Sequence, residues 1–187
     1  EAGTDNIELT ENWHILATEM RPARGWKING DFAYKSIDQF RTDQELVYYY
    51  HNVDKSVTAW GDTYPSEIHQ FHQSNYYWTS NLYTSYEFSL KERHNFSILG
   101  GMQFEYGRNR SINVHKFDML VPSVPSLSTA TGEATIFENL AHSATEGYFG
   151  RFSYNFDQRY LLEVNARYDG TSVFRYGKRW GFFPSFS

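Results

Sequence analysis

The sequence predicts an all-β protein, an antiparallel up-and-down segment of a transmembrane β-barrel. Three observations predict this fold class: apolar and polar residues alternate with a period of two, helical periodicity is hard to find, and short and long connections alternate along the chain. Successive side chains of a strand point to opposite faces of its sheet. Each alternating segment therefore has one apolar and one polar face.

The first clear strand is GWKINGDFAYK, residues 25–35. Trp26 and Phe32 stand at even positions, and Lys27 and Asp31 stand at odd positions. The apolar face is therefore expected at even numbers. Two later segments show the same parity: SNLYTSYEFSL (80–90) and NFSILGGMQFEYG (95–107).

The stretch YFGRFSYNFDQRYLLEVNARYDG, residues 148–170, contains two strands joined by the short turn DQR. Even positions are apolar on both sides of the turn, and directly opposed residues of an antiparallel pair share a face. The turn must therefore hold an odd number of residues. The predicted pairs are Phe156–Tyr160, Tyr154–Leu162, Phe152–Val164 and Gly150–Ala166 on the apolar face, and Ser153–Glu163 and Phe149–Arg167 on the polar face.

Short connections (RPARG, KERH and DQR) alternate with long ones, which are expected at about 36–74 and 108–145. The second long connection holds VPSVPSLSTATGEAT, a Pro-, Ser- and Thr-rich stretch without periodicity. Strands of about 9–11 residues suffice to cross a bilayer. Short turns at one end and long loops at the other are the plan of an outer-membrane barrel.

The composition excludes several classes of function. The 187 residues carry a net charge of −5 and no basic stripe, so no nucleic-acid partner is expected. The absence of cysteine excludes disulfides and thiolate metal sites, and no apolar run of about 18 residues exists to form a membrane helix. The start, EAGTDNIELTEN, is polar and acidic, and the end, GFFPSFS, looks cut within an element, so we expect a piece of a longer polypeptide.

Alternation alone fits a soluble β-sandwich nearly as well as a barrel wall. Three features favour the barrel: the polar face holds residues suited to a wide wet interior, the long loops fall on one side, and the ends of the apolar face are aromatic, as interfacial girdles are. These aromatic ends are Trp26, Tyr34, Tyr148 and Tyr168.

Residues 154–187 resemble the SusC/RagA family of TonB-dependent outer-membrane transporters of the Bacteroidetes. The matching elements are RYLLEVNARYDGTSVF (159–174) and RWGFFPSFS (179–187), and residues 91–106 and 147–156 are similar to the preceding strands of that family. The first half of the chain matches only in style. The resemblance gives ten residues a structural role: Arg159, Tyr160, Asp169, Gly170, Phe174, Arg179, Trp180, Gly181, Phe183 and Pro184.

The resemblance implies a Gram-negative outer-membrane location and a 22-stranded barrel closed by an N-terminal plug. Such transporters import oligosaccharides, and sometimes peptides, with energy from TonB and with a SusD-like surface lipoprotein over the mouth. Residues 1–187 are then expected to supply seven or eight strands of the barrel domain, with no plug domain and no TonB box. The implied partners are the rest of the barrel and its plug, the lipoprotein, outer-membrane lipid, and the TonB complex through the absent N-terminal region.

Neither enzymatic activity nor a cofactor or metal is expected. Glu163 and Asp169 share a strand face six residues apart, or about 20 Å, which is too far for a glycosidase pair. His69 and His72 of HQFH would lie on opposite faces of a strand with no third ligand near in sequence, so a polar loop is the favoured interpretation.

Three groups of residues remain candidates for contact or pairing. Asp169 and Gly170 are expected to end a strand and begin an extracellular turn, although Asp169 and Arg175 can also be read as cargo contacts. The charged face, with Arg151, Glu163, Arg167 and Asp169, is expected to pair across strands or against the plug. Aromatic residues crowd the first long loop, where they contact cargo, contact the lipoprotein or pack the loop: Tyr48, Tyr49, Tyr50, Trp60 and Tyr64.

The expected function is therefore TonB-dependent import of large nutrients. Two rivals stay open from the sequence alone: a secreted β-sandwich that binds carbohydrate through exposed aromatic rings, and an outer-membrane adhesin barrel that transports nothing.

Overall fold

The computed structural model describes residues 3–187, which form strands joined by turns and two short 3₁₀ segments. No helix in this described range is long and apolar enough to cross a membrane. The elements are β1 (Gly3–Ala23), β2 (Trp26–Glu45), β3 (Tyr49–His51), β4 (Val57–Ala59), η1 (Gly61–Thr63), β5 (Glu67–Leu90), β6 (His94–Phe117), η2 (Leu127–Thr129), β7 (Ala134–Phe156), β8 (Tyr160–Thr171) and β9 (Trp180–Phe186).

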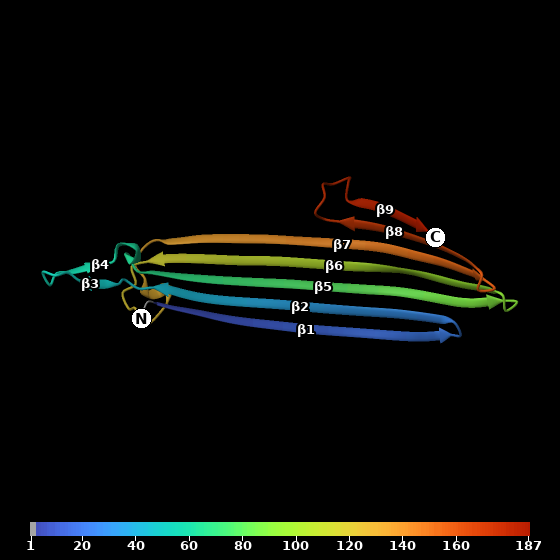
Figure 1. The fold of residues 1–187 in the computed structure, drawn as a ribbon, viewed down its shortest axis with the longest axis horizontal. Coiled ribbons are helices and arrows are strands. Elements are labelled where there is room, and N and C mark those ends of the chain that lie inside the picture. The colour runs from blue at the N-terminus through green and yellow to red at the C-terminus, as the bar shows by residue number, and fades with distance from the viewer. Residues whose placement is uncertain (1–2) are drawn as a thin grey trace. The chain divides into compact units, whose positions relative to one another are not determined.

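Seven strands form one sheet in the order β1-β2-β5-β6-β7-β8-β9, and β3 pairs with β4 in a separate hairpin (Figure 1). Strands that are adjacent in this sheet follow one another in the chain, apart from the hairpin inserted between β2 and β5. This is the up-and-down arrangement that the sequence predicts. The all-β fold class is confirmed.

Four strands are much longer than predicted: β2 has 20 residues, β7 has 23, and β5 and β6 have 24 each. The two long connections shrink accordingly, to residues 46–66 and 118–133. The expected loops at 36–74 and 108–145 were therefore wrong at both ends. These strand extensions carry polar residues on both faces and therefore show no clear alternation. A strand surrounded by water does not require one of its faces to be apolar.

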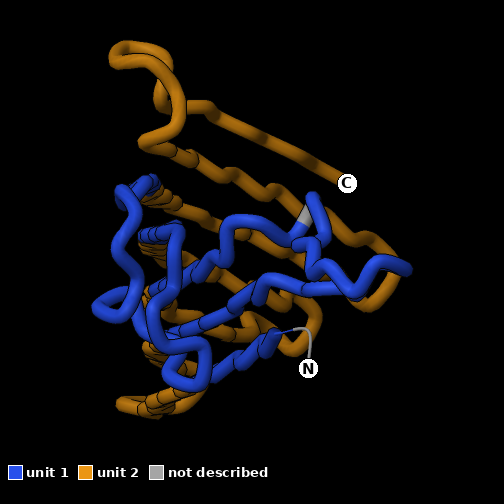
Figure 2. The backbone as a smooth tube through the Cα atoms, turned by 90° about the vertical axis from the view of Figure 1, so that its left-hand side faces the viewer, with its two compact units in different colours: residues 1–11, 36–75, 109–141 blue, residues 12–35, 76–108, 142–187 orange. Residues whose placement is uncertain are grey.

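The chain divides into two compact units, coloured separately in Figure 2. Unit 1 contains residues 1–11, 36–75 and 109–141, and unit 2 contains residues 12–35, 76–108 and 142–187. The two long connections, 46–66 and 118–133, belong to unit 1. The short turns and the β8–β9 connection belong to unit 2.

The predicted register between β7 and β8 is confirmed. Phe152 lies opposite Val164 and Ser153 opposite Glu163. The turn of three residues, 157–159, keeps the parity of the two strands, as the alternation requires. The other four predicted pairs are also present: Phe156–Tyr160, Tyr154–Leu162, Gly150–Ala166 and Phe149–Arg167.

The even-numbered face of unit 2 is apolar and exposed. Phe152 retains 37% exposure, Val164 42% and Ile98 46%. Aromatic rings also meet across strands here, with Phe96 centred 4.9 Å from both Phe88 and Tyr154. Apolar side chains arranged this way fit a barrel wall that faces lipid.

In unit 1 the even-numbered face carries charged and polar residues beside apolar ones. Arg110 Nε lies 2.7 Å from Glu138 Oε1, and His72 packs edge-on against Phe40 with ring centroids 6.3 Å apart. A charged pair on this face is costly in hydrocarbon and ordinary in water. The more consistently apolar even-numbered face is therefore that of unit 2.

Unit 1 holds a small apolar core at its loops. Ile68 is fully buried and clusters with Met119 and Ala130. The backbone N–H of Asp118 donates to Ser66 O at 2.8 Å, and that of Met119 donates to Ser66 Oγ at 2.9 Å. These contacts fix the loop 118–133 against the start of β5.

Candidate cargo and partner surfaces

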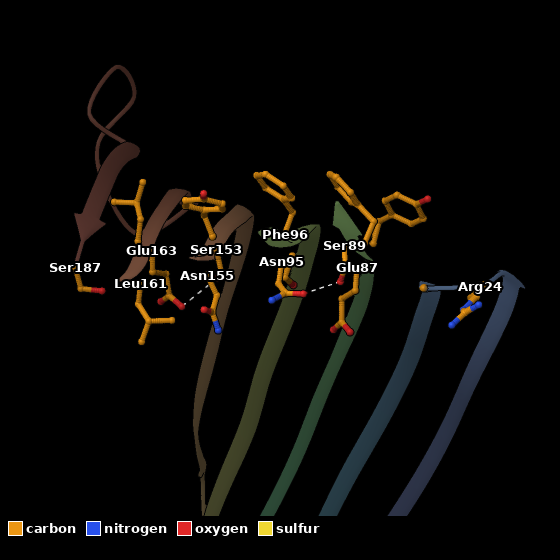
Figure 3. A pocket seen from close by; sticks show the side chains of 16 residues that line it. Arg24, Glu87, Ser89, Asn95, Phe96, Ser153, Asn155, Leu161, Glu163 and Ser187 are labelled. Carbon is orange, nitrogen blue, oxygen red and sulfur yellow. Dashed lines mark hydrogen bonds between the residues drawn. The ribbon is translucent and has the colours of Figure 1, made fainter. Parts of the chain in front are cut away.

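A hollow of about 1050 Å³ lies on the polar face of unit 2 (Figure 3). In this view Phe96 points to one side of the sheet, whereas Glu87, Asn155 and Leu161 point to the other. The alternation of one apolar and one polar face is thus visible at the level of single side chains. The hollow also takes in Arg24, Ser89, Asn95, Ser153, Glu163 and Ser187.

Polar groups in this hollow are paired with one another. Glu163 Oε2 accepts a hydrogen bond from Ser153 Oγ at 3.2 Å, and Glu163 Oε1 accepts one from Asn165 Nδ2 at 2.8 Å. Arg151 Nε lies 3.7 Å from Glu163 Oε1. Asn95 Oδ1 accepts from Ser89 Oγ at 2.6 Å. Of the charged face, which is expected to pair across strands or against the plug, Arg151 on β7 thus meets Glu163 on β8, and its Nε donates to Asn165 Oδ1 at 2.8 Å.

A second polar network connects β8 to β6 across the intervening strand β7 in unit 2. Arg167 on β8 donates from Nε to Asp169 at 2.7 Å, and from Nη2 to Gln103 Oε1 on β6 at 3.0 Å. β7 lies between these two strands, and Gly147 on it makes room for the reach. A Cβ at Gly147 would stand 2.5 Å from Asp169 Oδ1 and 3.0 Å from Arg167 Nη2.

The motif residues around Gly170 form an aromatic surface. Gly170 pairs with Trp180 across β8 and β9, and the indole lies over the glycine, so that a Cβ there would stand 2.8 Å from Trp180 Cδ2. Trp180 also stacks on Tyr168 with centroids 4.7 Å apart. On the opposite face of β9, the ring of Phe183 covers Gly181, and an added Cβ there would stand 2.8 Å from Phe183 Cζ.

The remaining motif residues lie at turns and at the last strand. Tyr160 stacks on Phe156 across the 157–159 turn, with centroids 6.3 Å apart, and the backbone N–H of Arg159 donates to Phe156 O. Arg179 Nε donates to Phe174 O at 3.0 Å and so closes the β8–β9 connection. Pro184 lies on β9, opposite Ala166.

Asp169 and Gly170 are still paired residues of β8, which ends one residue later, at Thr171. The turn begins after them, so the predicted position of the turn is close but early. The Asp169 carboxylate is held by Arg167, as described above.

The aromatic residues of the first long connection fall into one segment of unit 1. The backbone N–H of Trp60 donates to the backbone oxygen of Tyr48 at 2.7 Å, and this hydrogen bond closes the base of the β3–β4 hairpin. Tyr50 meets the Trp60 ring edge-on at 6.0 Å. All five candidate rings are exposed to solvent to a substantial extent: Tyr48, Tyr49, Tyr50, Trp60 and Tyr64.

The hairpin tip is ordered by a hydrogen-bonded acid. Asp54 Oδ1 accepts from both Ser56 Oγ at 2.6 Å and Ser56 N at 2.9 Å. The Ser56 hydroxyl, and then its backbone N–H, lower the pKa of Asp54 below its ordinary value.

His69 and His72 lie on β5, so the expected polar loop was wrong. They do take opposite faces, as alternation requires: His72 packs on Phe40, and His69 meets His115 of β6 with ring centroids 3.8 Å apart. His115 lies 46 residues from His69, a separation that a search of local spacing does not cover.

Known proteins match this chain along its whole described length. The family model described as "TonB dependent receptor-like, beta-barrel" matches residues 3–187. The chain is 29% identical over 133 residues to "TonB-dependent receptor SusC" of Bacteroides thetaiotaomicron, covering 70% of this chain and 13% of that protein. It is 26% identical over 122 residues to "TonB-dependent receptor P26" of Formosa agariphila, covering 58% of this chain and 11% of that protein.

Solved structures give the same fold. A chain of the RagAB peptide transporter superposes with a TM-score of 0.86 at 16% identity, covering 99% of this chain and 20% of that one. The present chain thus spans between 11% and 20% of the length of these relatives. With its up-and-down strands and its exposed apolar face, the chain belongs to the TonB-dependent receptor β-barrel family of the outer membrane.

Proposed function

We propose that this chain is part of the wall of a transporter that imports large nutrients through the outer membrane in a TonB-dependent manner. The observation that carries the proposal is the opposition of faces in unit 2. Phe152 and Val164 form an exposed apolar pair on one face, and Ser153 and Glu163 form a hydrogen-bonded polar pair on the other. This is the arrangement of a barrel wall between lipid and a wet interior.

Four partners follow from the same proposal. β1 and β9 are the two outer strands of the sheet, and hydrocarbon does not tolerate unpaired strand edges, so further strands of the same protein complete the barrel. A plug domain occupies the polar side, where the Glu163 hollow offers hydrogen-bonding groups. The plug region connects to the TonB complex. A SusD-like lipoprotein covers the extracellular mouth.

The exposed rings of the first long connection are the proposed contact for cargo or for the lipoprotein. Trp60 and Tyr64 are 57% and 65% exposed, and planar rings stack on sugar rings as well as on apolar peptide side chains. The cargo class is an oligosaccharide or a peptide. Similarity to RagAB, which is described as a peptide transporter, supports a peptide as the cargo. Similarity to SusC, a TonB-dependent receptor, supports the transporter function without indicating the cargo class.

Uptake by cells that carry the full-length protein tests the proposal. A strain lacking the gene is complemented with wild type, with Trp60→Ala/Tyr64→Ala, or with Val53→Ala, which alters an exposed residue in the same hairpin without removing a ring. We expect wild type and Val53→Ala to restore uptake of a labelled oligosaccharide or oligopeptide, and the double variant to reduce it at least about tenfold.

Two results would count against parts of this proposal. If wild type restores no uptake of either cargo class while the strain still adheres to surfaces, the protein is an adhesin. If the double variant takes up cargo and binds the lipoprotein as wild type does, the rings only pack the loop.

A further inference from the structure

Three potential metal ligands converge on one face of unit 1. Glu67 and His69 are two residues apart on β5 and therefore share a face, and His115 reaches them from the adjacent strand β6. One ligand atom from each of the three lies within 4.8 Å of the others. The spacing along one strand and the pairing across two strands give this convergence without any loop.

The distances within this cluster are short. His115 Nε2 lies 2.9 Å from Glu67 Oε2, and His69 Nε2 lies 3.7 Å from Glu67 Oε1. Both imidazoles thus direct Nε2 to the two oxygens of one carboxylate. Tetrahedral ligands at about 2.0–2.1 Å from a zinc ion stand about 3.3–3.4 Å apart. The two Glu67–His distances differ from that separation by a few tenths of an ångström, and the ligand atoms of the two histidines lie within 4.8 Å of one another.

His69 Nε2 is shielded from solvent and makes no hydrogen bond to any described residue. A buried ring nitrogen without a partner is costly. The other nitrogen of this ring, Nδ1, faces Asp43 Oδ2 of β2 at 3.6 Å. A carboxylate at Nδ1 orients a metal-binding histidine and raises the basicity of its Nε2, so Asp43 fits the role of a supporting residue.

The backbone beneath the cluster is well held. Ile68, between the two ligands on β5, is the fully buried residue of the unit 1 core, and Ser66 is tied to the 118–133 loop. Asn109 Nδ2 donates a hydrogen bond to Asn75 Oδ1, and these residues stand six positions from His115 and His69 on their strands. The register that brings the two histidines together is therefore supported on both sides.

We propose that Glu67, His69 and His115 bind a Zn²⁺-like divalent transition ion, with Asp43 supporting His69. Two imidazoles and one carboxylate are the ligand set of open zinc sites, whereas Mg²⁺ and Ca²⁺ prefer oxygen ligands. Without an ion, the Glu67 carboxylate accepts a hydrogen bond from His115 Nε2. On binding, the neutral His115 ring carries its proton on Nδ1, and the ion takes the place of the proton at Nε2 and ties β5 to β6. Its fourth position is left to water or to an outside donor.

Zinc binding by the full-length transporter tests this proposal. The protein is purified in detergent, stripped of metal with a chelator and titrated with Zn²⁺ or Mg²⁺ by calorimetry. Because other parts of the protein can also bind zinc, the difference between wild type and variants is the quantity that tests the site. Wild type is compared with His115→Ala and with His115→Gln, which preserves most of the side-chain volume. His72→Ala is the matched control, since His72 lies on the opposite face of the same strand.

We expect wild type and His72→Ala to bind one Zn²⁺ more tightly than both His115 variants, by about 100-fold or more. Asp43→Asn is expected to weaken binding by about 10- to 100-fold, the range seen for residues that support a metal ligand. Co²⁺ at this site should show the intense visible absorption of a tetrahedral ion, which the His115 variants lack.

The proposal is overturned if the His115 variants, shown to be folded by their heat-dependent mobility in gels, bind as many zinc ions as wild type with equal affinity. It is also overturned if Mg²⁺ competes with Zn²⁺ on equal terms at the affected site, or if His72→Ala loses the ion as His115→Ala does.

Discussion

Replacing Phe152 by arginine places a charge near the middle of the lipid-facing surface. Phe152 is four residues from both Tyr148 and Phe156, the rings at the two ends of this stretch of β7, or about 13 Å along the strand in each direction. A hydrocarbon band of about 25 Å is therefore centred near this position. The expected cost of arginine at such a depth is about 2–4 kcal/mol of folding free energy.

Two matched variants separate depth from face. Tyr148→Arg puts the same charge on the same face at its aromatic end, where a cost of about 0–1 kcal/mol is expected. Ser153→Arg puts it on the opposite face, beside Glu163, whose carboxylate already accepts a hydrogen bond from Ser153. The neighbouring position thus offers the new charge a partner instead of acyl chains.

The assay is urea unfolding of the full-length protein in lipid vesicles, followed by tryptophan fluorescence and by gel mobility. We expect the midpoint to fall clearly for Phe152→Arg and to change little for Tyr148→Arg. If Phe152→Arg leaves the midpoint unchanged while Ser153→Arg lowers it by an amount equivalent to 2 kcal/mol or more, the assignment of the two faces is reversed.

Two further substitutions test the packing described above. Gly170→Ala should lower the free energy of unfolding by about 1–3 kcal/mol, because its new Cβ would stand 2.8 Å from the Trp180 indole. Gly170→Ala combined with Trp180→Ala should recover most of this loss in the same unfolding assay. If the effects of the two substitutions are strictly additive, the contact is contradicted. Ile68→Ala removes the fully buried side chain of unit 1 and should lower the local free energy of unfolding by about 2–5 kcal/mol. We expect faster amide hydrogen exchange across residues 118–133 and little change at residues 148–168. Unchanged exchange in the 118–133 loop would contradict its attachment to β5.

The sequence predicted the lipid-facing part of the sheet well, because hydrocarbon imposes alternation on every strand that contacts it. The pairs around Phe152–Val164 follow from parity alone, since a shift by one residue would exchange a phenylalanine for a serine on the lipid side. Outside hydrocarbon this constraint disappears. The ends of β2, β5, β6 and β7 were assigned to loops for that reason.

β1 illustrates a different loss of signal. Trp13 and Ile15 stand at odd positions and Leu16 and Met20 at even ones, so neither face is consistently apolar. All four are substantially exposed in this chain. A period-two pattern is absent although the strand forms. β1 is held in the sheet by its backbone pairing with β2, which the pattern of side chains does not indicate.

The histidine cluster was missed because its members are distant in sequence. His69 and His72 were considered together, and their opposite faces argued correctly against joint ligation. The partner on the correct face is His115, which is brought to His69 by the antiparallel register of β5 and β6. That register depends on the turn between them and on 24-residue strands that sequence patterns described only in part.

The length of these strands affects where a solute would first be selected. A strand of 24 residues extends about 80 Å along its backbone, while a tilted crossing of the bilayer takes about 10 residues. More than half of the residues of such a strand are therefore not needed to cross the hydrocarbon. In the transport proposed here, discrimination among solutes then occurs before membrane depth is reached, where each contact competes with hydration and tight capture requires several weak contacts acting together.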